Sequence, residues 1–92
     1  MIFVGYTHRL GRVDHESIEN YRKNKDVERV VIFCRIEPSK EIEDLFKSYE
    51  VIVTENPRKE AKRFAKEMKK QGKKVEVFDL QDFGERAIRD TC

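Results

Sequence analysis

Short runs of apolar residues alternate along the chain with stretches in which apolar residues recur every three or four positions. The first pattern is typical of β-strands and the second of amphipathic helices. We expect strands over residues 2–6, 29–36, 50–55 and 74–80, and helices over residues 14–23, 38–48, 57–71 and 82–88. Strands that alternate with helices predict a parallel sheet, because each helical crossover returns the chain to the same end of the sheet.

Two of the expected strands differ in their pattern. The second contains an unbroken apolar run, residues 30–34, which is typical of a strand covered on both faces. The fourth alternates apolar with charged residues, which indicates a sheet edge or a half-exposed face.

The expected fold is a single α/β domain over residues 1–92. It is a three-layer α/β/α sandwich of the Rossmann-like or flavodoxin-like kind, with a four-stranded parallel sheet. A chain of 92 residues suits one small domain. We expect the strand order 2-1-3-4, with 3-2-1-4 as the alternative. In either order the loop after the first strand borders the crevice in which such sheets bind ligands.

Charged residues make up 41% of the chain, well above the ~25% of an average domain. The 20 Lys and Arg residues nearly balance the 18 Asp and Glu residues, so the net charge of +2 selects no partner. Abundant charges of both signs resemble the composition of hyperthermophile proteins.

Several familiar signatures are missing from the sequence. No apolar run approaches the ~18 residues of a membrane span, and the first residues lack the basic start of a signal peptide. We therefore expect a soluble, cytoplasmic protein with no membrane partner. The glycine patterns of dinucleotide-binding and phosphate-binding loops do not occur. Cys34 and Cys92 form no CxxC pair, so the sequence predicts no zinc or redox motif.

The loop after the first expected strand is the first candidate site. It carries a histidine and two arginines beside a glycine, just before a helix N-terminus. Helix N-termini attract anions, and arginine binds phosphate through two hydrogen bonds. The residues predicted to bind phosphate or nucleic acid here are Thr7, His8, Arg9, Gly11 and Arg12. The alternative is a charged surface loop whose arginines pair with nearby acids.

The third expected helix is the second candidate site. Residues 57–74 contain nine Lys or Arg and two Glu, a local charge of +7. A basic stripe is typical of nucleic-acid binding, and the absence of exposed aromatic residues limits it to backbone contacts. The predicted binding residues are Asn56, Arg58, Lys62, Lys66 and Lys70, and the last four follow one another at four-residue spacing. The alternative is a solvated lysine-rich helix.

Acidic residues provide a third candidate. Glu37, Glu55 and Asp79 fall at the carboxyl ends of three expected strands. Two of these carboxylates could hold Mg²⁺ for reactions of phosphate esters, with His8 as general acid or base. The candidate catalytic residues are therefore His8, Glu55 and Asp79. The alternative is that these acids are solvated or start helices.

We favour a non-enzymatic module that binds a phosphate-bearing partner, nucleic acid in preference to a free nucleotide, without a cofactor or metal. The alternatives are a small Mg²⁺-dependent enzyme acting on phosphate esters and a protein-interaction subunit without a ligand. In the order 2-1-3-4 the apolar second strand would lie at a sheet edge, which predicts a homodimer through that strand. In the order 3-2-1-4 that strand is internal and needs no partner.

Overall fold

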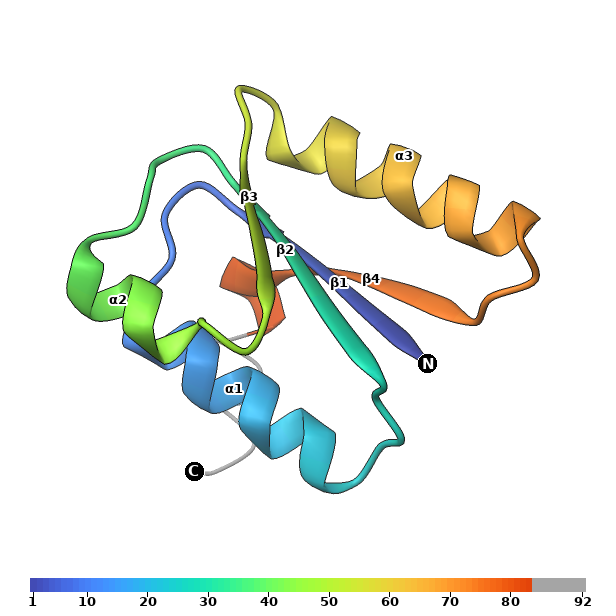
Figure 1. The fold of residues 1–92 in the computed structure, drawn as a ribbon, viewed down its shortest axis with the longest axis horizontal. Coiled ribbons are helices and arrows are strands. Elements are labelled where there is room, and N and C mark those ends of the chain that lie inside the picture. Colours follow the sequence, from blue (N-terminus) through green and yellow to red (C-terminus); the bar gives the residue numbers. More distant parts are fainter. Residues whose placement is uncertain (84–92) are drawn as a thin grey trace.

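A computed structural model of the protein describes residues 1–83 (Figure 1). Its elements are β1 (Ile2–Thr7), α1 (Arg12–Lys23), β2 (Arg29–Cys34), α2 (Lys40–Leu45), β3 (Glu50–Val53), α3 (Pro57–Lys70) and β4 (Val75–Asp79). The predicted alternation of strands and helices is therefore confirmed. A further helix begins at Leu80, and most of the last expected helix lies outside the described residues.

All strand pairs are parallel, and the strand order is β3-β2-β1-β4. The expected order 2-1-3-4 is wrong, and the alternative order 3-2-1-4 is confirmed. β2 lies between β1 and β3, and all its residues except Arg29 are buried. Because β2 has no open edge, the homodimer expected through this strand loses its basis. β4 does lie at an edge, as its alternating pattern indicated.

Alternate residues of the central strands face two separate hydrophobic cores. Phe3 and Ile32 belong to the core that includes Ile18 of α1. Val4 and Val31 belong to the core on the side of α3, with Ala61 and Ala65 (the two buried residues of that helix). Helices α1 and α2 thus cover one face of the sheet and α3 covers the other (Figure 1).

The first helix begins at Arg12, two residues earlier than expected. The N-cap is Gly11, and Asp14 is the third residue of the helix. Its carboxylate accepts a hydrogen bond from the backbone N–H of Gly11 at 2.9 Å. This contact satisfies a backbone N–H donor at the start of the helix. The Asp14 side chain thus places a negative charge at the N-terminus of α1.

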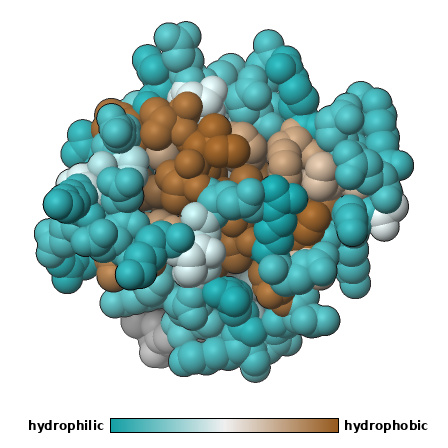
Figure 2. Space-filling model, in the orientation of Figure 1, coloured by the Kyte–Doolittle hydropathy of each residue, from teal (hydrophilic) through white to brown (hydrophobic). Residues whose placement is uncertain are grey.

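The short edge strand β3 leaves apolar side chains at the surface. Ile52 is 42% exposed and Val53 is 49% exposed. Figure 2 shows apolar side chains gathered over β3 on this face of the molecule. Within residues 1–83, no helix has both the length and the apolar character needed to cross a membrane.

Candidate functional site

A hollow of about 300 Å³ opens at the carboxyl edge of the sheet. Three loops and the start of α3 line this carboxyl-edge hollow, which lies where the rule for open α/β sheets expects a ligand. Six of the residues predicted from sequence line it together: Thr7, His8, Glu55, Asn56, Arg58 and Asp79. The structure therefore brings parts of all three candidate sites to one place.

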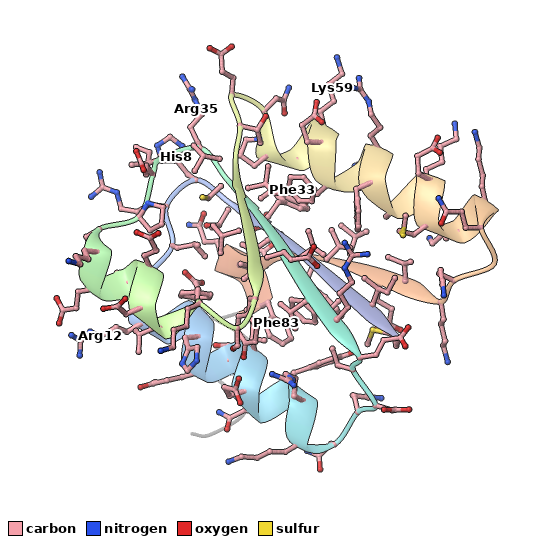
Figure 3. All side chains as sticks on the ribbon, viewed as in Figure 1. His8, Arg12, Phe33, Arg35, Lys59 and Phe83 are labelled. Carbon is pink, nitrogen blue, oxygen red and sulfur yellow. The ribbon has the colours of Figure 1, made fainter. Side chains whose placement is uncertain are left out.

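Backbone hydrogen bonds hold the loops of the hollow against one another. The carbonyl of His8 accepts hydrogen bonds from the backbone N–H groups of Arg35 at 3.1 Å and Ile36 at 3.0 Å. The N–H of Thr54 donates to the carbonyl of Cys34 at 2.8 Å. The loops after β1, β2 and β3 are thus connected in a row, and Arg35 is fixed next to His8 (Figure 3).

Arg35 is the main residue of the hollow that the sequence did not reveal. The second strand was expected to continue to residue 36, which placed Arg35 inside the strand instead of after it. β2 ends at Cys34, so Arg35 is the first residue of the following loop, and it is exposed. The position of an arginine directly after a buried apolar run was the available signal.

Tyr6 and Gln81 also line the hollow without having been predicted. Tyr6 is half-buried at the end of β1 and contributes an aromatic ring. The backbone N–H of Gln81 donates to the Asp79 carboxylate at 3.1 Å, which orients that carboxylate. The hollow therefore combines two arginines, two carboxylates, the imidazole of His8 and the phenol ring of Tyr6.

The rest of the first loop lies elsewhere. Arg12 is exposed and forms an ion pair with Glu41 of α2, below His8 in the view of Figure 3, and it does not line the hollow. Arg9 is exposed, and neither Arg9 nor Gly11 lines the hollow. The Asp14 carboxylate already accepts a hydrogen bond at the N-terminus of α1. This helix start therefore attracts a bound anion less strongly than the sequence indicated.

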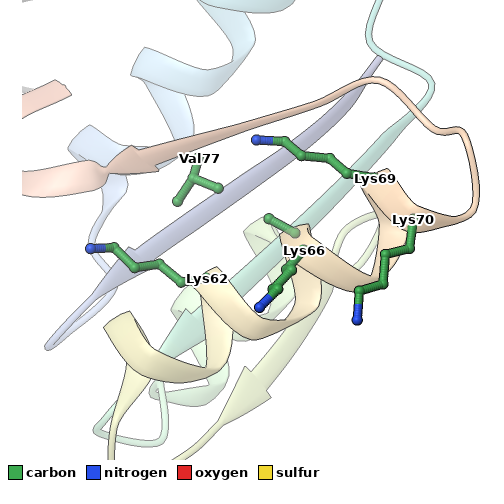
Figure 4. Close-up of a pocket in the computed structure, with 6 residues that line it drawn as sticks. Lys62, Lys66, Lys69, Lys70 and Val77 are labelled. Carbon is green, nitrogen blue, oxygen red and sulfur yellow. The ribbon is translucent and has the colours of Figure 1, made fainter.

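A second concave surface, the lysine groove, runs between α3 and the edge strand β4. It has a volume of about 560 Å³ and an apolar base formed by Ala65 and Val77. Its walls carry four lysines: Lys62, Lys66, Lys69 and Lys70. Figure 4 shows Lys62 and Lys69 extending toward Val77, with Lys66 and Lys70 on the outer side of the helix.

The two flanks of α3 carry different charge patterns. On the side of β2, Phe64 packs against Phe33 with ring centroids 5.9 Å apart. The two acids of the helix pair with basic residues three positions away, Glu60 with Arg63 at 3.5 Å and Glu67 with Lys70 at 3.8 Å.

These pairs leave the β4 flank of α3 uniformly basic. Among residues 1–83, Lys62, Lys66 and Lys69 make no ion pair. The strict four-residue spacing of the predicted stripe included Lys62, Lys66 and Lys70, which all line the groove, but it missed Lys69. Lys69 joins them because residues three and four positions apart share one flank of a helix.

The acidic residues converge only in part. Glu55 and Asp79 line the hollow together with His8, whereas Glu37 does not. Within residues 1–83, no three His, Cys, Asp or Glu side chains are arranged so that they could hold a metal ion. Cys34 is buried, and burial raises the pKa of its thiol, which keeps it protonated and unreactive at neutral pH.

No protein-family model matches the chain, and no curated protein or solved structure matches it. The protein has an α/β fold with a parallel sheet and two concave surfaces. One is a basic groove beside the edge strand β4, and the other is a hollow with charges of both signs at the carboxyl ends of the strands.

Proposed function

We propose that this protein is a non-enzymatic module that binds the sugar–phosphate backbone of a nucleic acid in the lysine groove. The observation that supports this function is the gathering of four lysines around one open groove. Only Lys70 among them has an ion-pair partner within the described residues. A surface with this charge attracts a polyanion and releases the counterions condensed on it.

The lysines are arranged at a cost to the helix. Lys62 and Lys66, like Lys66 and Lys70, are like-charge pairs four residues apart, which destabilise a helix by about 0.2–0.5 kcal/mol each. Among residues 1–83, only Lys70 of these lysines has an acidic partner, Glu67, that offsets part of this repulsion. A bound phosphate backbone offsets it, so the arrangement favours an anionic partner over a purely solvated helix.

The dimensions of the groove favour a polymer over a free nucleotide. Lys62 and Lys69 are separated by about 10 Å along the helix axis, at 1.5 Å per residue. Each strand of duplex DNA carries one phosphate per ~3.4 Å of axis, so several phosphates fit along this length. Among residues 1–83, no aromatic ring lines the groove. We therefore expect backbone contacts that are independent of sequence.

The arrangement of the helices supports assigning the fold to the three-layer, Rossmann-like class. The two cores lie on opposite faces of a parallel sheet, and the order of strands changes direction at β1. In such sheets, ligands bind outside the carboxyl ends of the strands. This class is compatible with a binding module as well as with an enzyme.

A Mg²⁺-dependent enzyme acting on phosphate esters is the second candidate, because His8, Glu55 and Asp79 line one hollow. We prefer the binding function because Arg35 and Arg58 line the same hollow and, among residues 1–83, no third carboxylate lines it beside Glu55 and Asp79. The exposed Ile52 and Val53 on β3 are the surface that a protein-interaction subunit would use.

Fluorescence anisotropy with a mixed-sequence oligonucleotide at about 50 mM salt tests the proposal. Binding should weaken as salt increases, with a log–log slope of about −2 to −3 for a single strand that contacts three or four lysines. A protein that leaves the anisotropy unchanged at this salt concentration does not have the proposed function.

A triple charge reversal locates the binding surface. The groove variant carries Lys62→Glu, Lys66→Glu and Lys69→Glu. A matched control reverses three exposed lysines on other elements: Lys23, Lys25 and Lys47. Both variants undergo the same change in net charge. The groove variant should lose binding, and the control should retain most of it. An equal loss in both would assign the binding to overall charge and contradict the groove.

A further inference from the structure

The carboxyl-edge hollow contains two arginines that backbone binding in the lysine groove does not use. Arg35 follows β2 and Arg58 lies in the first turn of α3, and both side chains line the hollow. Both residues are exposed, and neither makes an ion pair with any residue in the range 1–83. Arginine forms strong, often paired hydrogen bonds with phosphate oxygens.

The remaining groups of the hollow suit the sugar and base that accompany a phosphate. Tyr6 offers a half-buried ring against which a base can stack. Glu55 and Asp79 accept hydrogen bonds from hydroxyl or amino groups, and the Asp79 carboxylate is already oriented by the N–H of Gln81. The ligand chemistry that matches this set is a nucleotide unit.

The two arginines favour a terminal phosphate over the interior of a nucleic-acid backbone. An internal phosphodiester carries one negative charge and has two unesterified oxygens. A terminal phosphate carries a charge of about −1.5 to −2 and has three strong acceptor oxygens, which two arginines can bind together. The terminal phosphate therefore distinguishes a phosphorylated strand end from a strand interior.

The hollow and the groove lie in sequence along one helix. Arg58 precedes Lys62 by four residues, so both side chains lie on the same flank of α3, about 6 Å apart along its axis. A strand whose backbone occupies the lysine groove therefore reaches the hollow at the N-terminal end of the helix.

We propose that the carboxyl-edge hollow binds the phosphorylated end of the nucleic-acid strand whose backbone lies in the lysine groove. Arg35 and Arg58 hold the terminal phosphate, and Tyr6 stacks with the terminal base. This inference rests on the proposed function and adds to it a preference for strand ends.

Internally labelled single strands with a 5′-phosphate, a 3′-phosphate or two hydroxyl ends test this preference. One of the two phosphorylated strands should bind about tenfold more tightly than the hydroxyl form, the effect of one charge-assisted pair of hydrogen bonds. Arg35→Ala should reduce this ratio to about one. Arg12→Ala, a change of an exposed arginine outside the hollow, should leave the ratio unchanged.

The outcomes separate the two proposals. Equal affinity for all three strands, or an equal loss for all three in Arg35→Ala, overturns the strand-end site but leaves the proposed function intact. No binding of any strand overturns the proposed function itself. Calorimetric titration with free mononucleotides adds a second arm. Tight binding of a mononucleotide without a preference among the strands would assign the hollow to a free nucleotide and overturn the strand-end site.

Discussion

Gly5 occupies a position at which even a methyl group would disturb the core. It lies in the middle of β1, with β2 on one side and β4 on the other. A Cβ atom built on Gly5 would lie 2.8 Å from Cδ2 of Leu80 and 3.0 Å from its Cγ. Leu80 is only 1% exposed, so its side chain has no free space to move into. The sequence shows a glycine within a strand but not the leucine, 75 positions later, that packs over it.

We expect Gly5→Ala to lower the free energy of unfolding by about 1–3 kcal/mol, the usual cost of adding a methyl group to a packed core. Urea denaturation measures the change. Gly11→Ala is the matched control, because the nearest atom to its added Cβ lies at 3.9 Å and the backbone there is extended. A Gly5→Ala protein as stable as the control would show that Leu80 repacks without cost.

Tyr21 connects α1 to the edge strand β4. Its hydroxyl donates to the carboxylate of Glu76 at 2.6 Å, and burial together with this bond raises the pKa of Tyr21 to about 12. The unfolded chain has an ordinary tyrosine pKa near 10. Its contribution to stability is therefore complete below pH 10 and is lost as the pH rises toward 12. Urea denaturation between pH 9 and 11.5 should show this loss.

Tyr21→Phe is the control for this pH dependence, because lysines also titrate in the same range. The variant should be less stable than the unmodified protein at pH 9, and the difference should shrink as the pH rises. A difference that stays constant up to pH 11.5 would show that folding does not raise the pKa of the Tyr21 hydroxyl group.

At the scale of single elements, α3 shows which features the sequence could predict. Its bounds follow from local chemistry, since Asn56 and Pro57 start the helix and Gly72 follows its end with a φ of +84°. One flank of α3 carries acids in ion pairs, and the flank beside β4 carries lysines without such pairs among the described residues. Which flank lies beside β4 depends on the order of the strands in the sheet, and local chemistry does not determine that order.

The cap of α3 can be tested separately. The side-chain oxygen of Asn56 accepts a hydrogen bond from the N–H of Lys59 at 3.2 Å. We expect Asn56→Ala to lower the free energy of unfolding by about 1 kcal/mol and Asn56→Asp to preserve it, because aspartate caps equally well. Thermal or urea denaturation gives both values. Equal losses in the two variants would show that the amide group, and not the cap, is what the fold requires.

At the scale of the whole molecule, the sequence predicted the elements but favoured the wrong order for them. The buried run of β2 already indicated a strand with cover on both faces, and its internal position is the simplest way to obtain that cover. The rule that ligands bind at the carboxyl ends of strands located Thr7, His8, Glu55, Asn56 and Asp79 of the hollow without any motif, whereas Arg58 was predicted from the basic helix. Arg35 was missed because the end of β2 was placed two residues too late.

The central position of β1 has a consequence for how the molecule assembles. β1 pairs with β2 across fewer than 30 residues, but with β4 across more than 70, as Ile2 aligns with both Arg29 and Val75. The contacts between β1 and β4 are expected to form late. Bringing the two strands together costs chain entropy before their hydrogen bonds and side-chain contacts can offset that cost. A ribosome-bound chain can therefore assemble β1, β2 and β3 while one edge of β1 is still open. The docking of β4 then supplies Val77 to the groove and Asp79 to the hollow. The groove and the hollow are therefore both completed by the same strand, the one that pairs across the longest stretch of chain.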